Sequence, residues 1–338
     1  MTTAPLLEAR DLRVAFHLRR ASDMPWTKPT LLHAVNGVNF DLMPGETLGI
    51  VGESGSGKST LARALIQMVP ATGKAIWQGK TDLLALSSRE MLKYRADIQM
   101  VFQDPLASLN PRMTVGQIIA EPLKTHRKGI KPAEVKDRVK AMMDRVGLLP
   151  NQINRYPHEF SGGQCQRIGI ARALIVEPKL LICDEPVSAL DVSIQAQVIN
   201  LLAELQRDLG LAMIFIAHDL SVVKHISDRV MVLYLGRTME LASSHDLYSA
   251  PQHPYTQALL SAVPIPDPQA ERAKVVIPLA GDLPSPLKPP SGCVFRTRCP
   301  RAVDRCTNEV PVLQGNGHAV ACHFPGTLQL AEIARATA

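Results

Sequence analysis

The stretch Gly52–Ser59 reads GESGSGKS, and it decides the fold of this chain. It matches the phosphate-binding loop (P-loop), in which two glycines separated by four residues are followed by Lys and Ser. A short apolar run, Thr47–Val51, precedes it, and the helix-like segment Leu61–Met68 follows it. Glycines let backbone N–H groups converge on a phosphate without side-chain obstruction. We therefore expect a strand, a loop and a helix that bind a nucleotide, rather than a glycine-rich turn that matches by chance.

The P-loop pattern assigns a role to each of its polar side chains. Lys58 is expected to contact the β- and γ-phosphates, and the Ser59 hydroxyl to bind Mg²⁺. The N-terminus of the following helix adds a favourable potential for an anion. The predicted ATP-binding residues in this segment are Gly52, Glu53, Ser54, Gly55, Ser56, Gly57, Lys58, Ser59 and Thr60.

Two carboxylates end a second apolar run, Leu180–Glu185, which reads LLICDE. Asp184 is placed to support the Mg²⁺ ion, and Glu185 to polarise the attacking water as a catalytic residue. The alternative is an acidic pair that only caps the next helix. The P-loop upstream favours the catalytic interpretation.

Two further polar residues also follow apolar runs. Gln103 comes after Ile98–Phe102 and can bind Mg²⁺ or the attacking water, and His218 comes after Met213–Ala217. A histidine at a strand end can reach a γ-phosphate and hold Glu185 in place. Taken alone, Gln103 is equally typical of a surface residue and His218 of the edge of a core.

A second loop, Ser161–Gln164, reads SGGQ and precedes a predicted helix. Ser161 is a good N-cap, and Gly162 and Gly163 allow an anion close to the backbone. Because one domain has one P-loop, we expect this loop to serve a nucleotide held by another subunit. A plain capped helix is the alternative.

Short apolar strands separated by helical stretches predict an α/β fold with a parallel sheet covered by helices. The strand pair Arg229–Leu235 and Arg237–Leu241 is expected to close the core. Apolar residues at helical spacing in Val135–Val146 and Gln164–Ile175 predict an inserted helical subdomain. Prolines dominate after about Ala250 and predict an irregular extension. The expected divisions are a core of residues 1–103 and 172–248, a helical subdomain of 104–171 and an extension of 249–338.

Composition restricts the kinds of molecule that this protein is expected to bind. The 338 residues carry 37 Lys and Arg against 31 Asp and Glu, a net charge of +6. The basic residues are scattered and no basic tract is interleaved with aromatics, so we expect no nucleic-acid partner. The segment MTTAPLLEAR lacks the pattern of a secretory signal. No apolar run approaches the ~20 residues that span a bilayer, so other chains would supply any membrane part.

The motifs together resemble the nucleotide-binding subunit of an ABC transporter. FSGGQ at Phe160–Gln164, the P-loop, LLICDE, SALD at Ser188–Asp191 and His218 occur in the family's order across about residues 6–250. The resemblance implies a P-loop ABC ATPase core in which two subunits sandwich two ATP molecules. It also implies the family's residue roles: a Q-loop at Gln103, a signature at Ser161, Gly162, Gly163 and Gln164, a D-loop at Asp191, a switch histidine at His218, Mg²⁺ held through Ser59, Gln103 and Asp184, and an aromatic side chain, best matched by Phe16, stacked on adenine.

Two residues qualify that resemblance. A core phenylalanine is the competing interpretation of Phe16. The family usually has Arg directly after the signature, and here Cys165 stands there. A basic side chain near the subunit interface is therefore expected to be missing.

The C-terminal segment resembles the extension of oligopeptide and dipeptide importer ATPases, through HPYTQALL at His253–Leu260 and GDLPSP at Gly281–Pro286. The match is closest to the second of the two ATPase subunits, and it implies ATP-driven peptide uptake. The implied partners are a homologous sister ATPase, two transmembrane permease subunits and, indirectly, an extracytoplasmic peptide-binding protein. The implied location is peripheral, on the cytoplasmic face of a bacterial inner membrane. Nickel, glycosides or opines stay open as cargo, and a soluble ABC ATPase outside transport is a further alternative.

The last four cysteines of the sequence are Cys293, Cys299, Cys306 and Cys322. Structural zinc sites usually contain close Cys pairs two to four residues apart, and none occurs here. The wide spacing and Cys299-Pro300 suit a [4Fe–4S] cluster, which the resemblance also implies. Zinc or free thiols are the alternatives. A cluster could simply hold together a proline-rich segment that has little core of its own.

Overall fold

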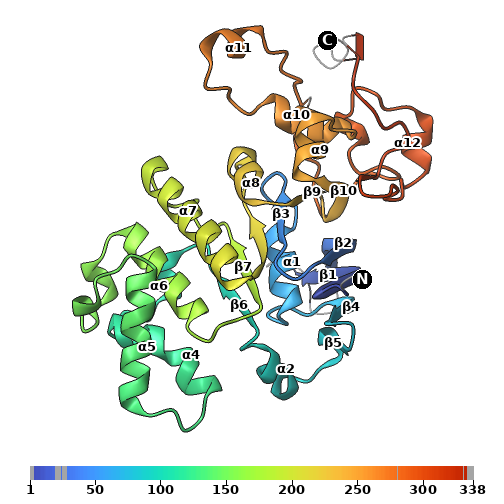
Figure 1. Ribbon diagram of the computed structural model, residues 1–338. Helices are drawn as coiled ribbons and strands as arrows, with labels where there is room; N and C mark the ends of the chain where they lie inside the picture. Colours follow the sequence, from blue (N-terminus) through green and yellow to red (C-terminus); the bar gives the residue numbers. More distant parts are fainter. Residues whose placement is uncertain (1–3, 20–23, 25–28, 280, 330, 333–338) are drawn as a thin grey trace.

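The computed structural model describes residues 4–19, 24, 29–279, 281–329 and 331–332. Its centre is a seven-stranded sheet, with helices gathered on one side and a smaller sheet on the other (Figure 1). The strands lie in the order β11 (Ala319–Val320), β10 (Arg237–Ser243), β9 (Arg229–Tyr234), β3 (Thr47–Val51), β8 (Ala212–Ile216), β7 (Leu180–Asp184) and β6 (Ile98–Val101). The α/β prediction is confirmed.

The strands from β9 to β6 are parallel to their neighbours, whereas β10 and β11 pair in the antiparallel sense. The sheet is therefore mixed rather than wholly parallel. The predicted strand Leu180–Asp184 has the bounds observed for β7, and β8 begins and ends one residue before the predicted run. Strand β11 comes from the extension, so that segment completes an edge of the central sheet.

A loop between two strands is expected from the sequence at Met24–Thr30, most of which lies outside the described residues, but a second, antiparallel sheet was not predicted. Its strand order is β2 (Thr30–Leu42), β1 (Leu7–Leu18), β4 (Thr72–Trp77) and β5 (Thr81–Asp82). The register between β1 and β2 shifts at several places, which breaks the strict alternation that reveals a strand in a sequence.

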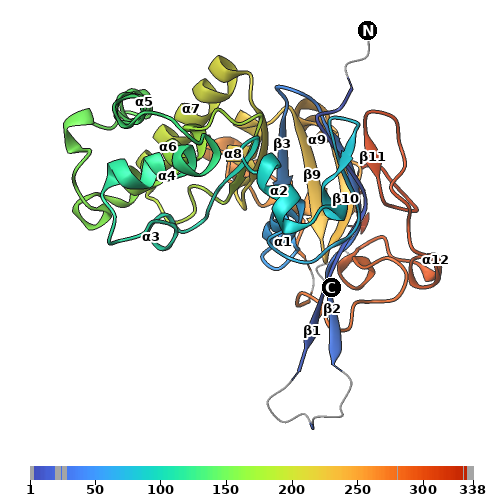
Figure 2. The ribbon, with the colours of Figure 1, turned by 90° about the horizontal axis from the view of Figure 1, so that it is seen from below.

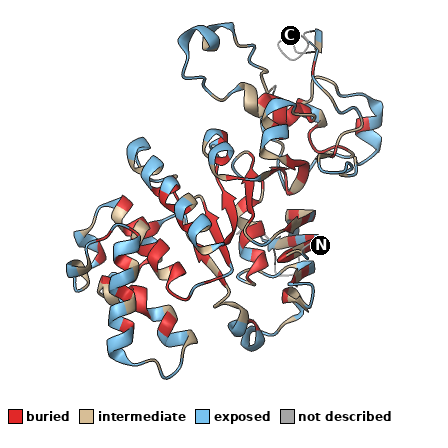
Figure 3. Cartoon of the chain, in the orientation of Figure 1, coloured by how far each residue is buried: buried red, intermediate tan, exposed pale blue. Residues whose placement is uncertain are grey.

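Side chains alternate between two cores across the central sheet, as the pleat of a strand requires. Leu48, Ile50 and Ile182 face the core shared with the smaller sheet and α1 (Lys58–Leu65), whereas Cys183 and Phe215 face the core shared with the helices. Buried residues accordingly concentrate in the central strands (Figure 3).

The helices fall into groups along the chain. Helix α2 (Ser88–Tyr94) precedes β6. The helices on the far side of the sheet from β1 and β2 are α3 (Pro105–Ser108), α4 (Val115–His126), α5 (Pro132–Arg145) and α6 (Gly162–Leu174). Helices α7 (Val192–Leu209) and α8 (Leu220–Ile226) lie beside them. The C-terminal part carries α9 (Ser244–Ser249), α10 (Pro254–Ser261), α11 (Pro268–Ala273) and α12 (Asp304–Asn308). Turned by 90°, the molecule has α4–α6 at one end and α12 and β11 at the other (Figure 2). Within the described part of the chain, no helix combines the length and apolar character needed to cross a membrane.

Candidate nucleotide-binding site

The P-loop joins β3 to α1, as its sequence predicts. Its glycines are required by close backbone contacts. A Cβ built on Gly57, where φ is 101°, would lie 2.2 Å from the carbonyl oxygen of Ala34. At Gly52, where φ is 148°, it would lie 2.1 Å from the carbonyl oxygen of Leu233. No other residue fits these two positions without moving the neighbouring strands.

A cavity of about 410 Å³ opens over this loop. Many of the residues predicted from the sequence line it together: Phe16, Ser54, Gly55, Gly57, Lys58, Ser59, Thr60, Gln103 and Glu185. Gly52, Glu53 and Ser56 do not line it. Ser56 is buried, and the Glu53 side chain points toward the C-terminal extension.

Lys58 is held by the loop itself. Its Nζ donates to the carbonyl oxygens of Gly52 (2.8 Å) and Glu53 (3.0 Å). An ammonium group has three N–H donors, and these bonds use two of them. Burial lowers the pKa of Lys58, while the carboxylates of Glu185, Asp184 and Glu53 act in the opposite direction. The buried ammonium therefore lies where a phosphate would supply the missing negative charge.

Ser59 and Asp184 form the oxygen-rich part of the site. The Ser59 hydroxyl donates to Asp184 Oδ1 at 2.6 Å, and the Asp184 side chain is fully buried. Asp184 Oδ2 has no hydrogen-bond partner among the described residues, and Arg63 Nη2 lies 3.6 Å away. A buried carboxylate oxygen without a hydrogen bond is uncommon and calls for an ion or water. Hydroxyl and carboxylate oxygens are the ligands that Mg²⁺ prefers, so the donor set fits this ion.

Glu185 lies at the end of β7, where three polar side chains meet. Gln103 Nε2 donates to Glu185 Oε2 at 3.0 Å, and His218 Nδ1 lies 3.9 Å from the same oxygen. Glu185 has a positive φ of 46°, which is sterically costly for a residue with a Cβ. Its backbone N–H is fixed by the carbonyl of Ile216 at 3.0 Å. The strained backbone directs the carboxylate toward the cavity.

The signature loop lies elsewhere. Ser161 caps α6 in a reciprocal capping box with Gln164, and Ser161 and Gly162 are exposed. None of the residues Ser161–Gln164 lines the P-loop cavity. A Cβ on Gly163 would lie 2.4 Å from Cγ2 of Ile194, so the loop packs against the first turn of α7. Asp191, the predicted D-loop residue, caps that helix by accepting from the Ile194 N–H at 3.0 Å.

Cys165 differs from what the sequence suggested. Its side chain is fully buried, its thiol donates to the carbonyl of Pro157 at 3.4 Å, and burial raises the pKa of the thiol. Cys165 faces the core of the helical region. The expectation that this position lies near the subunit interface, where a basic side chain would be missing, is therefore wrong. A small apolar residue is what this place accommodates.

Sequence patterns missed part of the cavity wall: Leu32, His33, Ala34, Leu235 and Pro286. The residues from β2 reach the site because Leu32 pairs with Phe16 across β1 and β2. Pro286 belongs to the extension, whose GDLPSP segment was used only as a sign of resemblance. No local sequence pattern predicts that the β2 residues or Pro286 line the cavity.

Of the four C-terminal cysteines, Cys306 lies in α12, Cys322 follows β11, and Cys293 and Cys299 lie in the irregular segment before α12; all are free thiols. Burial raises the pKa of Cys293 to about 11 and that of Cys299 to about 12, and neighbouring thiols of the group add to both shifts. Backbone N–H groups act the other way, from Phe295 on Cys293 and from Arg301 on Cys299.

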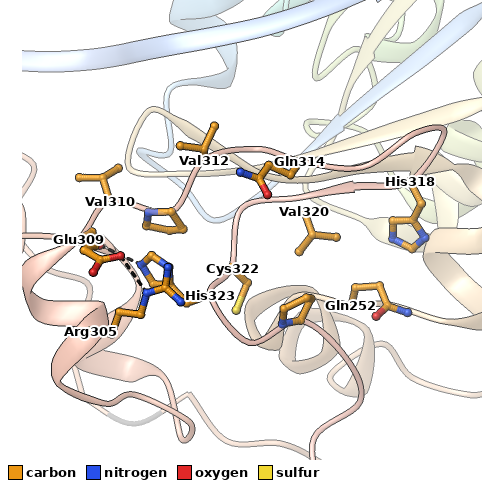
Figure 4. A pocket seen from close by; sticks show the side chains of 12 residues that line it. Gln252, Arg305, Glu309, Val310, Val312, Gln314, His318, Val320, Cys322 and His323 are labelled. Atoms are coloured by element: carbon orange, nitrogen blue, oxygen red, sulfur yellow. Dashed lines mark hydrogen bonds and ion pairs between the residues drawn. The ribbon is translucent and has the colours of Figure 1, made fainter.

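Cys322 also lines a cavity of about 680 Å³ within the extension, together with His318 and His323 (Figure 4). Across the described residues, no three His, Cys, Asp or Glu side chains are grouped to hold one metal ion. The described residues therefore provide a grouped set of ligands neither for zinc nor for the expected cluster. A [4Fe–4S] cluster bonds each thiolate through a different iron, so its ligands are spaced more widely, and N–H groups directed at sulfur are compatible with it.

Comparisons with known proteins agree with this geometry. The family model described as "ABC transporter" matches residues 35–188, and "Oligopeptide/dipeptide transporter, C-terminal region" matches residues 239–306. The chain is 65% identical over 319 residues to the oligopeptide transport ATP-binding protein OppF of Salmonella typhimurium, covering 94% of this chain and 95% of that protein. It is 63% identical to OppF of Escherichia coli over the same shares of both chains.

Solved structures show the same architecture for the ATPase part. A dimeric post-hydrolysis state of the ATP-binding cassette MJ0796, bound to ADP and Pi, superposes with a TM-score of 0.62 at 26% identity, over 70% of this chain and 98% of that one. The cbiO1 subunit from Clostridium perfringens, part of the ABC transporter complex cbiONQ, gives 0.61 at 28% identity over 72% and 91%. On these grounds, the chain belongs to the ABC transporter ATP-binding proteins, in the group of the oligopeptide transport ATP-binding proteins.

Proposed function

We propose that this protein hydrolyses ATP to drive the import of oligopeptides and dipeptides. The observation that carries the proposal is Glu185, which a strained backbone holds against Gln103 at the cavity of an intact P-loop. The high identity to OppF proteins over nearly the whole chain supports the peptide cargo.

Each side chain of the site has a proposed role. Lys58 and backbone N–H groups of the P-loop bind the phosphates, except the N–H of Glu53, which donates to Tyr255. Phe16 stacks on the adenine. Ser59, Gln103 and Asp184 bind Mg²⁺, directly or through water. Glu185 polarises the attacking water, and His218 holds Glu185 and contacts the γ-phosphate. The 3.0 and 3.9 Å separations of Gln103 and His218 from Glu185 support this arrangement.

The exposed signature loop is proposed to act in trans. Ser161, Gly162, Gly163 and Gln164 would contact ATP bound to the P-loop of a homologous sister ATPase, with Asp191 at the same interface. ATP binding across such an interface favours the closed dimer, and hydrolysis removes the γ-phosphate contacts that hold it closed. The separation of this loop from the chain's own P-loop supports the proposal.

The remaining partners follow from the same function. Two transmembrane permease subunits would form the translocation path, and a peptide-binding protein on the other side of the membrane would deliver cargo to them. The chain would be peripheral, on the cytoplasmic face of the inner membrane. The residues 1–103 and 172–248 form the proposed core, 104–171 the helical subdomain that transmits closure, and 249–338 the extension.

A [4Fe–4S] cluster is proposed as a structural element of the extension, held by Cys293, Cys299, Cys306 and Cys322. Burial raises the pKa of Cys293, Cys299 and Cys322, neighbouring thiols of the set raise it further, and backbone N–H groups are directed at these three sulfurs, which supports this set. The cluster would cross-link the Cys293–Cys299 segment to α12 and to the segment after β11.

The test is ATP hydrolysis by the full-length chain alone and in the complete transporter reconstituted in vesicles. Since the site needs a partner's signature, the verified monomer should hydrolyse ATP slowly, and the complex should hydrolyse it faster when peptide-bound binding protein is added. Strong turnover by the monomer, or a complex indifferent to peptide, would count against the proposal.

A further inference from the structure

Glu53 is the one P-loop side chain that turns away from the nucleotide cavity and into the C-terminal extension. Arg298 Nη1 donates to Glu53 Oε2 at 2.7 Å, across 245 residues of sequence. The backbone N–H of Glu53 donates to the Tyr255 hydroxyl oxygen at 2.9 Å. Two residues of the extension therefore hold both the side chain and the backbone of this P-loop residue.

The contacts continue from Glu53 to Lys58. The carbonyl oxygen of Glu53 accepts a bond from Lys58 Nζ at 3.0 Å. Glu53 thus has its carboxylate and N–H fixed by the extension while its carbonyl fixes the lysine that is proposed to bind phosphate. A displacement of Glu53 would move the anchor of Lys58.

An aromatic cluster makes this link rigid. Tyr255 and Phe295 of the extension pack on Tyr234 of β9, with ring centroids 4.8 Å (Tyr234–Tyr255), 5.3 Å (Tyr234–Phe295) and 5.2 Å (Tyr255–Phe295) apart. The three rings are essentially fully buried. The Arg298 guanidinium lies 6.0 Å from the Tyr234 ring centroid, and only 8% of its side chain is exposed. Arg298 Nε has no hydrogen-bond partner among the described residues, so the ion pair with Glu53 is the main polar contact of the guanidinium.

The charges of Glu53 and Arg298 affect how well the P-loop can accept the phosphates of ATP. Glu53 brings a carboxylate, only 23% exposed, into a loop that must accept the anionic phosphates of ATP. In a poorly hydrated place that repulsion is screened little by solvent. The buried guanidinium of Arg298 neutralises it.

We propose that Arg298 and Tyr255 are positioning residues of the ATP site, which the extension supplies in order to hold Glu53 and Lys58 in the phosphate-binding geometry. The inference rests on the proposed role of the P-loop. It makes the extension a working part of the nucleotide site in addition to any role of its cysteines.

The test is equilibrium Mg-ATP binding by the full-length chain, with thermal unfolding recorded for each variant. Arg298→Met is expected to weaken ATP binding about tenfold, because it leaves the carboxylate of Glu53 unpaired in the loop that binds the phosphates. The double variant Arg298→Met with Glu53→Gln should bind ATP as well as Glu53→Gln alone, since no carboxylate then needs neutralising. If the losses of ATP affinity in the two single variants simply multiply in the double variant, the inference is overturned.

The chain offers a matched control in Arg305. Like Arg298, it directly precedes a cysteine and pairs with a glutamate, Glu309, at 2.8 Å, but both partners are more than half exposed and lie away from the P-loop. Arg305→Met should keep ATP affinity within about twofold, as expected for an exposed pair. Equal effects of the two substitutions would overturn the inference.

Two further variants keep the test decisive if Arg298→Met unfolds. Tyr255→Phe keeps the ring cluster and removes only the hydroxyl acceptor, and it should weaken ATP binding about threefold to tenfold. Arg298→Lys keeps the charge and should fall between wild type and Arg298→Met. In the assembled transporter Arg298→Met should raise KM for ATP with little change in kcat, the pattern of lost binding rather than lost chemistry. Unchanged affinity in Tyr255→Phe and Arg298→Lys would sink the inference.

Lys58→Ala separates this inference from the function on which it rests. If Lys58→Ala binds ATP normally, the P-loop assignment itself fails. If Lys58→Ala loses binding while Arg298→Met and Tyr255→Phe retain it, the proposed function stands and the role of the extension is disproved.

Discussion

Gln103 Nε2 donates a 3.0 Å hydrogen bond to Glu185 Oε2. The two residues end neighbouring parallel strands, β6 and β7, and are 82 positions apart in the chain. The bond joins the start of the segment that leads into α3–α6 to the carboxylate at the cavity. A movement of that segment would therefore change the position of Glu185.

Glu185→Gln should separate binding from hydrolysis. The amide keeps the size and the hydrogen bond of the carboxylate but cannot accept a proton from water, so hydrolysis should fall by at least about a hundredfold. Mg-ATP affinity should stay near that of wild type. Phosphate release by the reconstituted transporter and ATP binding by the full-length chain measure the two quantities. Loss of both together would mean that Glu185 is a binding residue and not the base.

Two glycines of α6 should respond oppositely to alanine. At Gly163 the new Cβ would lie 2.4 Å from Ile194 Cγ2, whereas at Gly169 no atom lies within 4 Å. Gly163→Ala should cost about 1–3 kcal/mol of unfolding free energy through overpacking. It should also slow ATP turnover in the transporter, because it displaces the signature loop from α7. Gly169→Ala should stabilise the helix by about 0.5–1 kcal/mol. Thermal unfolding of both variants is the measurement, and a Gly163→Ala protein as stable as Gly169→Ala would refute the packing argument.

Iron and acid-labile sulfide analysis tests the cysteine proposal. Anaerobically purified protein should contain about four iron and four sulfide per chain and absorb in the visible range. Cys299→Ser should abolish both, whereas Cys165→Ser, which changes a buried thiol outside the extension, should leave them intact. Zinc in place of iron, or iron that survives Cys299→Ser, would reject the assigned ligand set.

His253 should make stability depend on pH. Burial lowers the pKa of His253 to about 3, and its Nδ1 accepts from the Tyr255 N–H at 3.0 Å. In the unfolded chain the pKa returns to about 6.5, so below that pH the unfolded state binds a proton that the folded state excludes. The contribution is complete above about pH 6.5 and falls by about 1.4 kcal/mol per pH unit as the pH drops toward 3.

His253→Asn is the matched variant, because its side-chain oxygen can replace Nδ1 as acceptor. Unfolding midpoints from pH 7 to 5 should decline less steeply in this variant than in wild type. Identical slopes would mean that His253 does not titrate as the structure implies.

The sequence predicted the parts of the site that have local patterns. Leu180–Asp184 was found because a fully buried strand has a continuous apolar run and the motif's carboxylates end it. The P-loop was found because its glycines are required by contacts of the backbone itself. Gln103 and Glu185 were predicted singly and Phe16 only through the family resemblance, and in the structure the three line one cavity.

The rest depends on contacts between distant segments. Beyond a loop between two strands, the smaller sheet was not predicted, because register shifts interrupt the alternation of β1. His33 and Pro286 reach the cavity through strand pairing and through the path of the extension, neither of which has a local pattern. The Arg298–Glu53 pair joins a glutamate of the P-loop to an arginine that belongs to no recognised motif. Only the docking of Tyr255 and Phe295 on β9 brings the pair together.

Peptide uptake by cells that lack this chain tests the central claim most directly. The account predicts that the wild-type chain restores ATP-dependent uptake of a radiolabelled oligopeptide and that Glu185→Gln, produced at the same level, does not. Restored uptake of nickel, a glycoside or an opine without any gain in peptide uptake would contradict it, and so would peptide uptake that survives Glu185→Gln.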